Sequence, residues 1–410
     1  MSDLALLGGT PVHQDPLPGG PMIDEDEMEA AARVLKSRNL SGFVGSPGEH
    51  HLGGPEVRTL EERWGSLGSY GGVVAVNSAT AALHVGVAAW ELERGSEVIV
   101  APYTMSATGA AVKMAGLDVR FADIDPELFT LTRDTVEAAL TDRTSAVLVV
   151  HLFGQMAPMA DLIELAERRG LKILEDAAQA PGATQNGAWP GHGTTGAVFS
   201  FNQHKSITSG EGGLLVSDDA RVVDIARLIR NHGESVVSAY PHIDGRDLIG
   251  WNYRLTEIEA AIAASQSDKL VFLTDWRIRL AERLTGGIAG ILGLRPPVVG
   301  EGNRHVYFTY PLTFDAGEWG IPREVFVKAL TAEGVPCVSG YAPPLYRLDL
   351  FKGDVDGRGN LRNCDHTADE SLVLIAACRW PVEEDQIDSV AEAIHKIWDR
   401  RAELAHYGDN

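Results

Sequence analysis

The stretch Phe199-Ser-Phe-Asn-Gln-His-Lys205-Ser-Ile-Thr-Ser-Gly-Glu-Gly-Gly213 contains an apolar run, a lysine and a glycine-rich turn, and it leads directly into another apolar run. The two apolar runs predict β-strands at residues 197–201 and 213–216. An isolated lysine is usually a solvated surface residue. This lysine, however, is flanked by hydroxyl groups and glycines, which allow close approach of the backbone to one amine. We therefore interpret the stretch as part of a functional site.

The alternation of short apolar runs with helical stretches extends toward the N-terminus. Further strands are predicted at residues 73–76, 97–101, 119–123, 146–151 and 172–175. Amphipathic stretches such as residues 80–92 and 158–169 lie between most of them. Strands that alternate with helices indicate a parallel sheet covered by helices. The predicted fold class is therefore α/β, with a large domain built on a mainly parallel seven-stranded sheet.

A break in this pattern marks a domain boundary. A long helical stretch runs from residue 256 to about residue 284, and the Gly/Pro-rich residues 286–302 follow it. Later elements are expected as strands at 306–314 and 336–339 and helices at 322–333 and 383–402. We therefore predict three parts, namely an N-terminal arm with a first helix (1–55), a large domain (56–284) and a small C-terminal α/β domain (285–410).

The composition excludes several function classes. The chain has 410 residues and a formal net charge of -22, which repels nucleic-acid phosphates and anionic membrane surfaces. Cys337, Cys364 and Cys378 are too widely spaced for a metal knuckle or a disulfide framework, and we interpret them as reduced core thiols. The sequence shows neither a signal-peptide pattern nor a stretch of about 18 apolar residues that could span a membrane. We expect a cytoplasmic protein without nucleic-acid or membrane partners, and we predict no metal site.

A carboxylate and an amide follow a predicted strand upstream of the lysine. The strand at residues 172–175 is followed by Asp176-Ala-Ala-Gln179. Ligands in open α/β sheets gather at the carboxyl ends of strands, although a lone aspartate at this place is more often a cap or a loop residue. In an apolar, partly buried setting Lys205 would have a lowered pKa, and a neutral amine attacks an aldehyde to form a Schiff base.

The motifs around Asp176 and Lys205, taken together, are specific enough to indicate a protein family. Asp176-Ala-Ala-Gln179, separated by 25 residues from Lys205-Ser-Ile-Thr-Ser-Gly-Glu-Gly-Gly213, resembles the DegT/StrS family of sugar and aminocyclitol aminotransferases, which are pyridoxal-phosphate enzymes of fold type I. The likeness covers roughly residues 25–400. Further matches occur in order along the chain, at Asn77-Ser-Ala-Thr80, Val100-Ala-Pro-Tyr-Thr104, His151-Leu-Phe-Gly154, Arg230-Asn-His-Gly233 and Gly250-Trp-Asn-Tyr-Arg254.

The resemblance implies how a bound pyridoxal 5'-phosphate would be held. Lys205 would carry it as a Schiff base and move protons, Asp176 would face the pyridine nitrogen, and Gln179 would bond the ring hydroxyl. Tyr103 matches the aromatic residue that stacks on the ring. A carboxylate beside the pyridine nitrogen keeps that nitrogen protonated, and the protonated ring is the electron sink of the reaction.

The phosphate of the cofactor needs backbone N–H groups and hydroxyls at the start of a helix. By the resemblance, Ser78, Ala79 and Thr80 would supply them, and Ser200 would supply a second hydroxyl contact. The family usually has glycine where this chain has Ala79. A plain helix cap is the alternative interpretation of this motif alone.

Two further residues are interpreted through the resemblance. Asn252 matches the residue that the family inserts into the neighbouring subunit's phosphate site, which implies a homodimer with shared active sites. On sequence alone it would be an ordinary turn residue. His204 precedes Lys205, and a relative that has histidine in place of the lysine performs dehydration. Because this chain retains the lysine, we interpret His204 as a structural neighbour that could also contact the substrate.

The substrate is predicted from the segment at residues 343–351, which corresponds to a lining of the acceptor pocket. Tyr346 and Arg347 are its candidate contacts, and nucleotide-sugar members usually have histidine at the first position. The segment and the early residues 6–11 look more like members that aminate free carbocycles. We therefore predict transfer of an amino group from L-glutamine or L-glutamate to a keto-cyclitol or keto-sugar in natural-product biosynthesis. The alternatives are a nucleotide-linked keto-sugar aminotransferase, a pyridoxal-phosphate-dependent dehydratase and a non-catalytic regulator with this fold.

Overall fold

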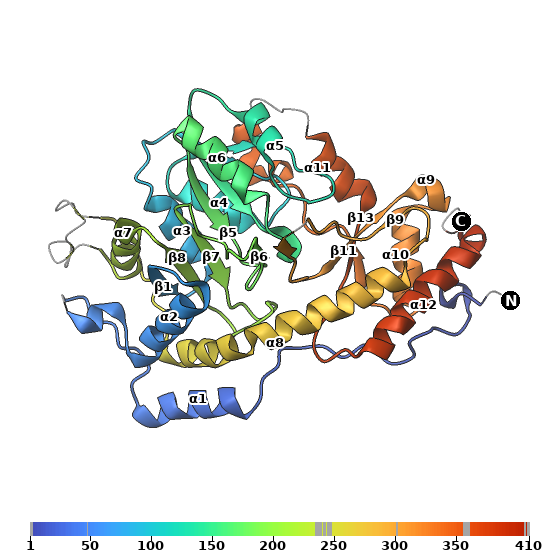
Figure 1. Cartoon of the computed structure of the whole chain (residues 1–410), viewed down its shortest axis with the longest axis horizontal. Coiled ribbons are helices and arrows are strands. Elements are labelled where there is room, and N and C mark those ends of the chain that lie inside the picture. The colour runs from blue at the N-terminus through green and yellow to red at the C-terminus, as the bar shows by residue number, and fades with distance from the viewer. Residues whose placement is uncertain are drawn as a thin grey trace.

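The computed structural model describes residues 3–46, 48–233, 240, 243, 248–300, 302–355, 361–405 and 407 of the chain. A seven-stranded sheet enclosed by helices occupies the larger part (Figure 1). Its strands, in order across the sheet, are β1 (Gly72–Val76), β8 (Gly213–Ser217), β7 (Gly196–Ser200), β5 (Lys172–Asp176), β4 (Thr144–Val150), β2 (Glu97–Val100) and β3 (Asp118–Phe121). All neighbours are parallel except β8, which is antiparallel to both β1 and β7. The predicted mainly parallel seven-stranded sheet is confirmed.

The central strands are buried, because helices cover the sheet. Every residue of β7 and β8 is buried, and strands buried on both faces read as continuous apolar runs. The surrounding helices are α2 (Pro55–Gly68), α3 (Ala79–Ala88), α4 (Ser106–Met114), α5 (Arg133–Ala139), α6 (Met159–Arg169) and α7 (Ala220–Arg230). Helix α3 ends four residues before its predicted end, and Glu91 just beyond it has a φ of +51°, which an α-helix does not contain.

One long helix, α8 (Glu257–Gly287), joins the two parts of the molecule. It begins at a capping box formed by Thr256 and Glu259. Leu270 and Leu273 pack into the core of the large part, whereas Leu280 and Leu284 pack into a second core that is formed mainly by C-terminal residues. Figure 1 shows this helix running beneath the sheet toward the C-terminal part. The position of the sheet relative to the C-terminal part therefore depends on one continuous helix.

The C-terminal part contains a four-stranded antiparallel sheet. Its order is β12 (Cys337–Ser339), β13 (Leu372–Ile375), β11 (Tyr310–Phe314) and β9 (Leu294–Arg295). The strand expected from residue 306 begins only at residue 310, because the Arg277 guanidinium binds the carbonyls of Tyr307 and Phe308 that a neighbouring strand would otherwise use. Strand β13 was not predicted, since four apolar residues are too short a run to be told from a helical segment.

Shorter elements complete the chain. Helices α9 (Ala316–Trp319), α10 (Arg323–Ala332), α11 (Arg362–His366) and α12 (Glu384–Arg400) belong to the C-terminal part, and β6 (Thr184–Gln185) pairs with β10 (Asn303–Arg304). Short segments of 3-10 helix lie at Ala5–Leu7, Glu49–Leu52, Leu152–Gly154, Leu345–Arg347, Asp349–Val355 and Arg401–Leu404, and a π-helical turn lies at Thr367–Ser371.

The N-terminal arm contacts both parts of the molecule. Leu4 is buried in the C-terminal core. The Glu333 carboxylate accepts hydrogen bonds from the backbone N–H groups of Ala5 and Val12 at 2.9 and 3.1 Å. Farther along, helix α1 (Glu25–Ser37) packs against α8 below the sheet (Figure 1). The arm therefore spans the boundary between the two hydrophobic cores.

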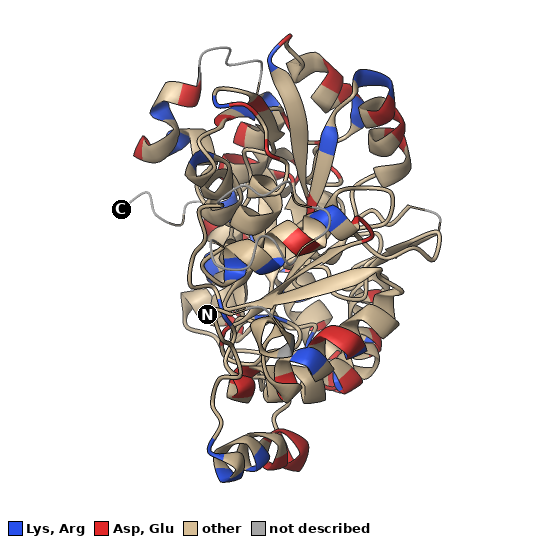
Figure 2. Cartoon of the chain, turned by 90° about the vertical axis from the view of Figure 1, so that its left-hand side faces the viewer, with Lys and Arg blue, Asp and Glu red and all other residues tan. Residues whose placement is uncertain are grey.

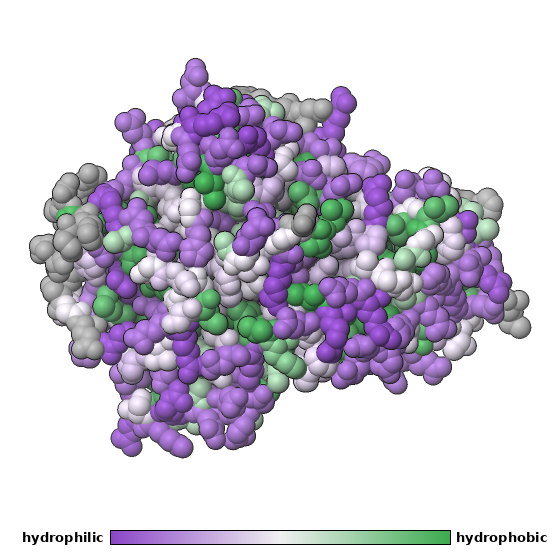
Figure 3. Space-filling view, in the orientation of Figure 1, coloured by the Kyte–Doolittle hydropathy of each residue, from purple (hydrophilic) through white to green (hydrophobic). Residues whose placement is uncertain are grey.

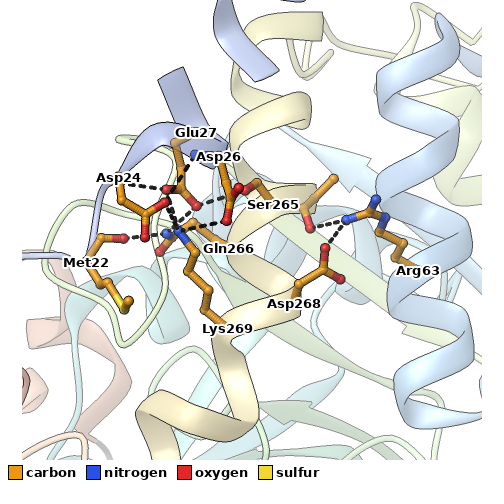
Figure 4. A network of polar contacts seen from close by, with 10 residues as sticks. Met22, Asp24, Asp26, Glu27, Arg63, Ser265, Gln266, Asp268 and Lys269 are labelled. Carbon is orange, nitrogen blue, oxygen red and sulfur yellow. Dashed lines mark hydrogen bonds and ion pairs between the residues drawn. The ribbon is translucent and has the colours of Figure 1, made fainter. Parts of the chain in front are cut away.

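A buried polar network holds the arm against α8 (Figure 4). Glu27 is 2% exposed and accepts hydrogen bonds from Lys269 at 2.7 Å and from Ser265 and Gln266 at 2.9 Å. Burial raises the pKa of Glu27, but the hydrogen bonds outweigh burial and lower this pKa to about 2. Lys269 also contacts Asp24 at 2.6 Å. The start of α1 is thus fixed by ionised and amide groups of α8.

The surface carries most of the charge. Figure 2 shows Lys, Arg, Asp and Glu mainly on helices and loops, and the neighbouring strands β1, β8 and β7 contain none of them. On the face seen in Figure 3, hydrophilic residues dominate and hydrophobic residues appear in small separate groups. Among the helices that the structure describes, none combines the length and the apolar character needed to cross a lipid bilayer.

Candidate active site

The loop between β7 and β8 fixes the backbone of Lys205. The Lys205 N–H donates to the Asn202 carbonyl at 2.8 Å. Gly210 and Gly212 have φ angles of +88° and +133°, in a region that side chains rarely adopt. A β-carbon at Gly213 would lie 2.5 Å from the backbone nitrogen at the start of α3. The glycines are therefore required both for the turn and for close packing of the loop against that helix.

The Lys205 side chain is partly buried and lies against an aromatic ring. Its Nζ is 4.9 Å from the centroid of the Phe308 ring. Burial lowers the pKa of Lys205, and the nearby Asp176 carboxylate partly opposes this effect. A larger fraction of this amine is therefore neutral than for a lysine in water, as nucleophilic attack on a carbonyl requires.

Asp176 closes strand β5 at the same end of the sheet. It is 6% exposed. Its Oδ2 accepts a hydrogen bond from the Thr108 hydroxyl at 2.8 Å, and its Oδ1 accepts one from the Ala178 N–H at 3.1 Å. Two donors from separate segments thus hold the carboxylate in one orientation. Sequence reasoning did not identify Thr108, which lies 68 residues away on α4.

Gln179 and Tyr103 are joined through Tyr341. The Gln179 side chain accepts from the Phe153 N–H at 2.8 Å and donates to the Tyr341 hydroxyl at 2.9 Å. The Tyr341 N–H donates to the Tyr103 hydroxyl at 2.7 Å, and burial raises the pKa of Tyr103 to about 12. Sequence reasoning missed Tyr341, although a tyrosine two residues after the strand expected at 336–339 was a usable signal.

Ser78, Ala79 and Thr80 form the start of α3 beside this loop. The Ser78 hydroxyl accepts from the Ala81 N–H at 3.1 Å, as an N-cap does. The first N–H groups of a helix have no partner within the helix, and its positive dipole end favours anions. Thr80 is exposed. This helix end can therefore bind an anionic group with backbone and hydroxyl donors.

Ser200 is the last residue of β7 and pairs with Gly213, which packs against the start of α3. It is 5% exposed at the end of β7. Its hydroxyl accepts from the Asn202 N–H at 3.3 Å. A bridge between Ser78 and Gly212 connects the loop to the start of α3. The structure thus places Ser78, Ala79 and Ser200 against the glycine-rich part of the loop that carries Lys205.

Three other candidates lie differently. Asn252 is exposed and forms an isolated β-bridge with Asn231, so no contact places it beside Lys205 of its own chain. The Tyr346 hydroxyl donates to Asp365, and Arg347 forms an ion pair with Asp369 at 2.7 Å. Neither Tyr346 nor Arg347 lines the recesses beside Lys205.

His204, by contrast, lines both recesses next to Lys205, which have volumes of about 390 and 210 Å³. Its side chain is exposed. A larger recess of about 760 Å³ lies at Lys172, which is at the opposite end of β5 from Asp176. Of the polar groups described above, Lys205 lines the smaller of these two recesses and Tyr341 lines the other, whereas Asp176 and Gln179 line neither.

Known proteins are similar to this chain in both sequence and fold. The DegT/DnrJ/EryC1/StrS aminotransferase family matches residues 21–395. A putative L-glutamine:3-amino-2,3-dideoxy-scyllo-inosose aminotransferase of Streptoalloteichus tenebrarius is 37% identical, over 85% of this chain and 83% of its own length. The L-glutamine:2-deoxy-scyllo-inosose aminotransferase of Streptomyces fradiae is 32% identical, over 99% of this chain and 100% of its own length.

A solved structure agrees with these matches. The crystal structure of DesI in the presence of its TDP-sugar product superimposes with a TM-score of 0.86 at 29% identity, covering 100% of this chain and 99% of that chain. The expectation of the fold-type I aminotransferase fold and the resemblance to this family are both confirmed. The chain belongs to the DegT/DnrJ/EryC1/StrS aminotransferase family and is an aminotransferase.

Proposed function

We propose that this aminotransferase uses pyridoxal 5'-phosphate to transfer an amino group from L-glutamine or L-glutamate to a free keto-cyclitol or keto-sugar in natural-product biosynthesis. The observation that carries the proposal is the partly buried amine of Lys205, which lies 4.9 Å from the Phe308 ring and close enough to the buried Asp176 carboxylate for the two charges to interact. The two relatives described above support the substrate class, because their names specify L-glutamine and an inosose. The nucleotide-linked alternative is supported by DesI, whose product is a TDP-sugar.

The residues present fit the proposed cofactor. The start of α3 offers N–H groups and the Ser78 and Thr80 hydroxyls for a phosphate. The packing of Gly213 against α3 would be blocked by a β-carbon. Between this end and the fixed carboxylate of Asp176, Lys205 provides an amine with a lowered pKa. Anion donors, an amine and a carboxylate are the groups that the phosphate, aldehyde and pyridine nitrogen of this cofactor need.

Each residue then has a definite task. When bound, pyridoxal phosphate supplies an aldehyde for the amine and a ring that accepts electrons. The Nζ of Lys205 would accept a proton from the α-carbon of the amino donor and deliver it to the cofactor. This task suits an amine whose pKa lies near neutrality. Asp176 would hold a proton on the ring nitrogen. Gln179, oriented by its hydrogen bonds with Phe153 and Tyr341, would bond a ring hydroxyl.

We further propose a homodimer in which Asn252 completes the partner's phosphate site. Asn252 is exposed in a single chain. The segment that carries it is nevertheless fixed, since the Trp251 N–H donates to the Ile229 carbonyl at 2.7 Å and the Asn77 N–H donates to the Tyr253 carbonyl at 2.9 Å. A rigid segment with an exposed amide suits a two-fold contact.

The test is a pair of half-reactions. The holoenzyme is first treated with L-glutamine or L-glutamate until the visible absorbance of the bound cofactor is lost. Free inososes, free ketoses and nucleotide-linked keto-sugars are then added separately. We expect free inososes to restore the absorbance, with Lys205→Ala as the inactive control. Restoration by nucleotide-linked sugars alone would contradict the proposed substrate. Loss of water from the ketone without amine transfer would indicate the dehydratase alternative.

A further inference from the structure

The two recesses beside Lys205 are lined by two arginine side chains and by no carboxylate. His204, Arg277 and Arg379 line both of them, and Lys205 lines the smaller one. None of the lining residues given by the structure is Asp or Glu. The whole chain has a formal net charge of -22. The positive charge of these recesses is therefore opposite in sign to the net charge of the chain. Such a recess attracts a negatively charged ligand.

The Arg379 guanidinium has donors that the protein leaves unused. Its Nε is buried without a hydrogen-bond partner, and no ion pair of its side chain occurs among the described residues. Arg277, in contrast, donates to the carbonyls of Tyr307, Phe308 and Cys378 at 3.2, 3.1 and 3.4 Å. Burying an unpaired guanidinium beside a second one costs free energy, and a bound anion would offset that cost.

The Arg277 and Arg379 side chains line the same two recesses. Burial lowers the pKa of Arg277 to about 10, and repulsion by Arg379 adds to this effect. Phe308 links the pair to the reacting amine, because its carbonyl accepts from Arg277 while its ring lies 4.9 Å from the Lys205 Nζ. The unused donors therefore lie in the same recess system as Lys205.

The N-terminal arm positions the Arg379 side chain from the other side. A β-carbon on Gly19 would lie 2.3 Å from the Arg379 Nη2. The neighbouring residues Gly20, Pro21 and Met22 line the smaller recess together with Lys205. The backbone of the arm thus confines the guanidinium. A larger residue at position 19 would displace the guanidinium without removing its charge.

We propose that Arg379, supported by Arg277 and His204, binds the α-carboxylate of the amino donor. This inference rests on the proposed function. Every α-amino acid carries a carboxylate on the carbon that bears the transferred amine, whereas a free keto-cyclitol carries no anionic group. The cofactor's own phosphate is matched by the start of α3. The diphosphate of a nucleotide-linked acceptor is the other anionic group that Arg379 could bind. The experiment below distinguishes this diphosphate from the donor carboxylate.

The experiment measures binding of an unreactive dicarboxylate to the holoenzyme. Glutarate is titrated by calorimetry into the wild type, Arg379→Gln, Arg379→Lys and Gly19→Ala. A charge-assisted hydrogen bond corresponds to a change in Kd of about tenfold to a hundredfold. We expect a loss of that size in Arg379→Gln, a smaller loss in Arg379→Lys, and weaker binding in Gly19→Ala, which keeps every charge. The KM for L-glutamine should rise in parallel while the KM for the ketone stays constant.

Controls distinguish the donor carboxylate from the acceptor diphosphate as the ligand of Arg379. They also separate this inference from the proposed function. Arg295→Gln removes an exposed charge from β9 and should leave glutarate binding unchanged. Unchanged glutarate affinity in Arg379→Gln, with the half-reaction intact in the wild type, would overturn the inference. If Arg379→Gln bound inorganic pyrophosphate more weakly and had a raised KM for the ketone, but bound glutarate normally, the site would belong to the acceptor. That result would also overturn the inference. A wild type without any amino-acid half-reaction would instead refute the proposed function.

Discussion

Replacement of Glu27 by glutamine tests how strongly the arm is held against α8. The carboxylate is 2% exposed and accepts hydrogen bonds from Lys269, Ser265 and Gln266 (Figure 4). These donors lower the pKa of Glu27 from an ordinary 4.5 to about 2. A difference of one pKa unit corresponds to about 1.4 kcal/mol. The ionised form is therefore worth about 3 kcal/mol relative to a neutral side chain, and Glu27→Gln should lose about this much of the free energy of unfolding at pH 7.

The pH dependence has a definite sign. The folded-state pKa of Glu27 lies below its ordinary value, so its contribution is fully present above pH 4.5 and is lost as the pH falls toward about 2. The neutral glutamine variant has no such dependence at this position. The gap in unfolding free energy between wild type and Glu27→Gln should therefore be largest at neutral pH and narrow at acidic pH.

Urea unfolding of the holoenzyme at several pH values measures this gap. Glu29→Gln is the matched control, because Glu29 lies on the same helix but is exposed, and surface changes usually alter stability by less than about 0.5 kcal/mol. Equal losses in the two variants would refute the reasoning. A gap that stays constant between neutral and acidic pH would show that the loss comes from packing and not from ionisation.

Four other outcomes are expected. Borohydride reduction of the holoenzyme followed by peptide mapping should place the pyridoxyl label on Lys205 and on no other lysine. Asp176→Asn should keep the bound cofactor but lose most transamination, because an amide cannot stabilise a protonated pyridine nitrogen; near-normal turnover would exclude that role. Mixing inactive Asn252→Ala and Lys205→Ala homodimers should restore about half of the wild-type activity per heterodimer, provided that mass measurements show subunit exchange. Gln266→Leu removes the acceptor of the buried Thr208 N–H and should cost about 1–3 kcal/mol in urea unfolding.

Several features were predictable because the signals that define them are local. The strands β1, β7 and β8 of the large sheet are short runs of mainly buried apolar residues, so their pattern is visible within about five positions. The motifs containing Asp176, Gln179 and Lys205 lie within or just after such runs. The sequence alone therefore indicated the sheet, the lysine of the candidate site and the family.

Boundaries were less predictable where distant groups compete for the backbone. The strand expected from residue 306 starts at residue 310, because Arg277 on α8 takes two of its carbonyls. The end of α3 depends on a turn at Glu91 that has a positive φ. Neither effect leaves a pattern in the surrounding residues.

Only the tertiary structure decided which side chains complete the site. Thr108 reaches Asp176 across 68 residues, Tyr341 reaches Gln179 across 162, and Arg379 meets Lys205 through a shared recess. These contacts arise because parallel strands end at one edge of the sheet and the C-terminal part is attached there through α8. Periodicity and turn chemistry are short-range properties of a chain, whereas the pairing of donors and acceptors far apart along it depends on how the finished elements pack.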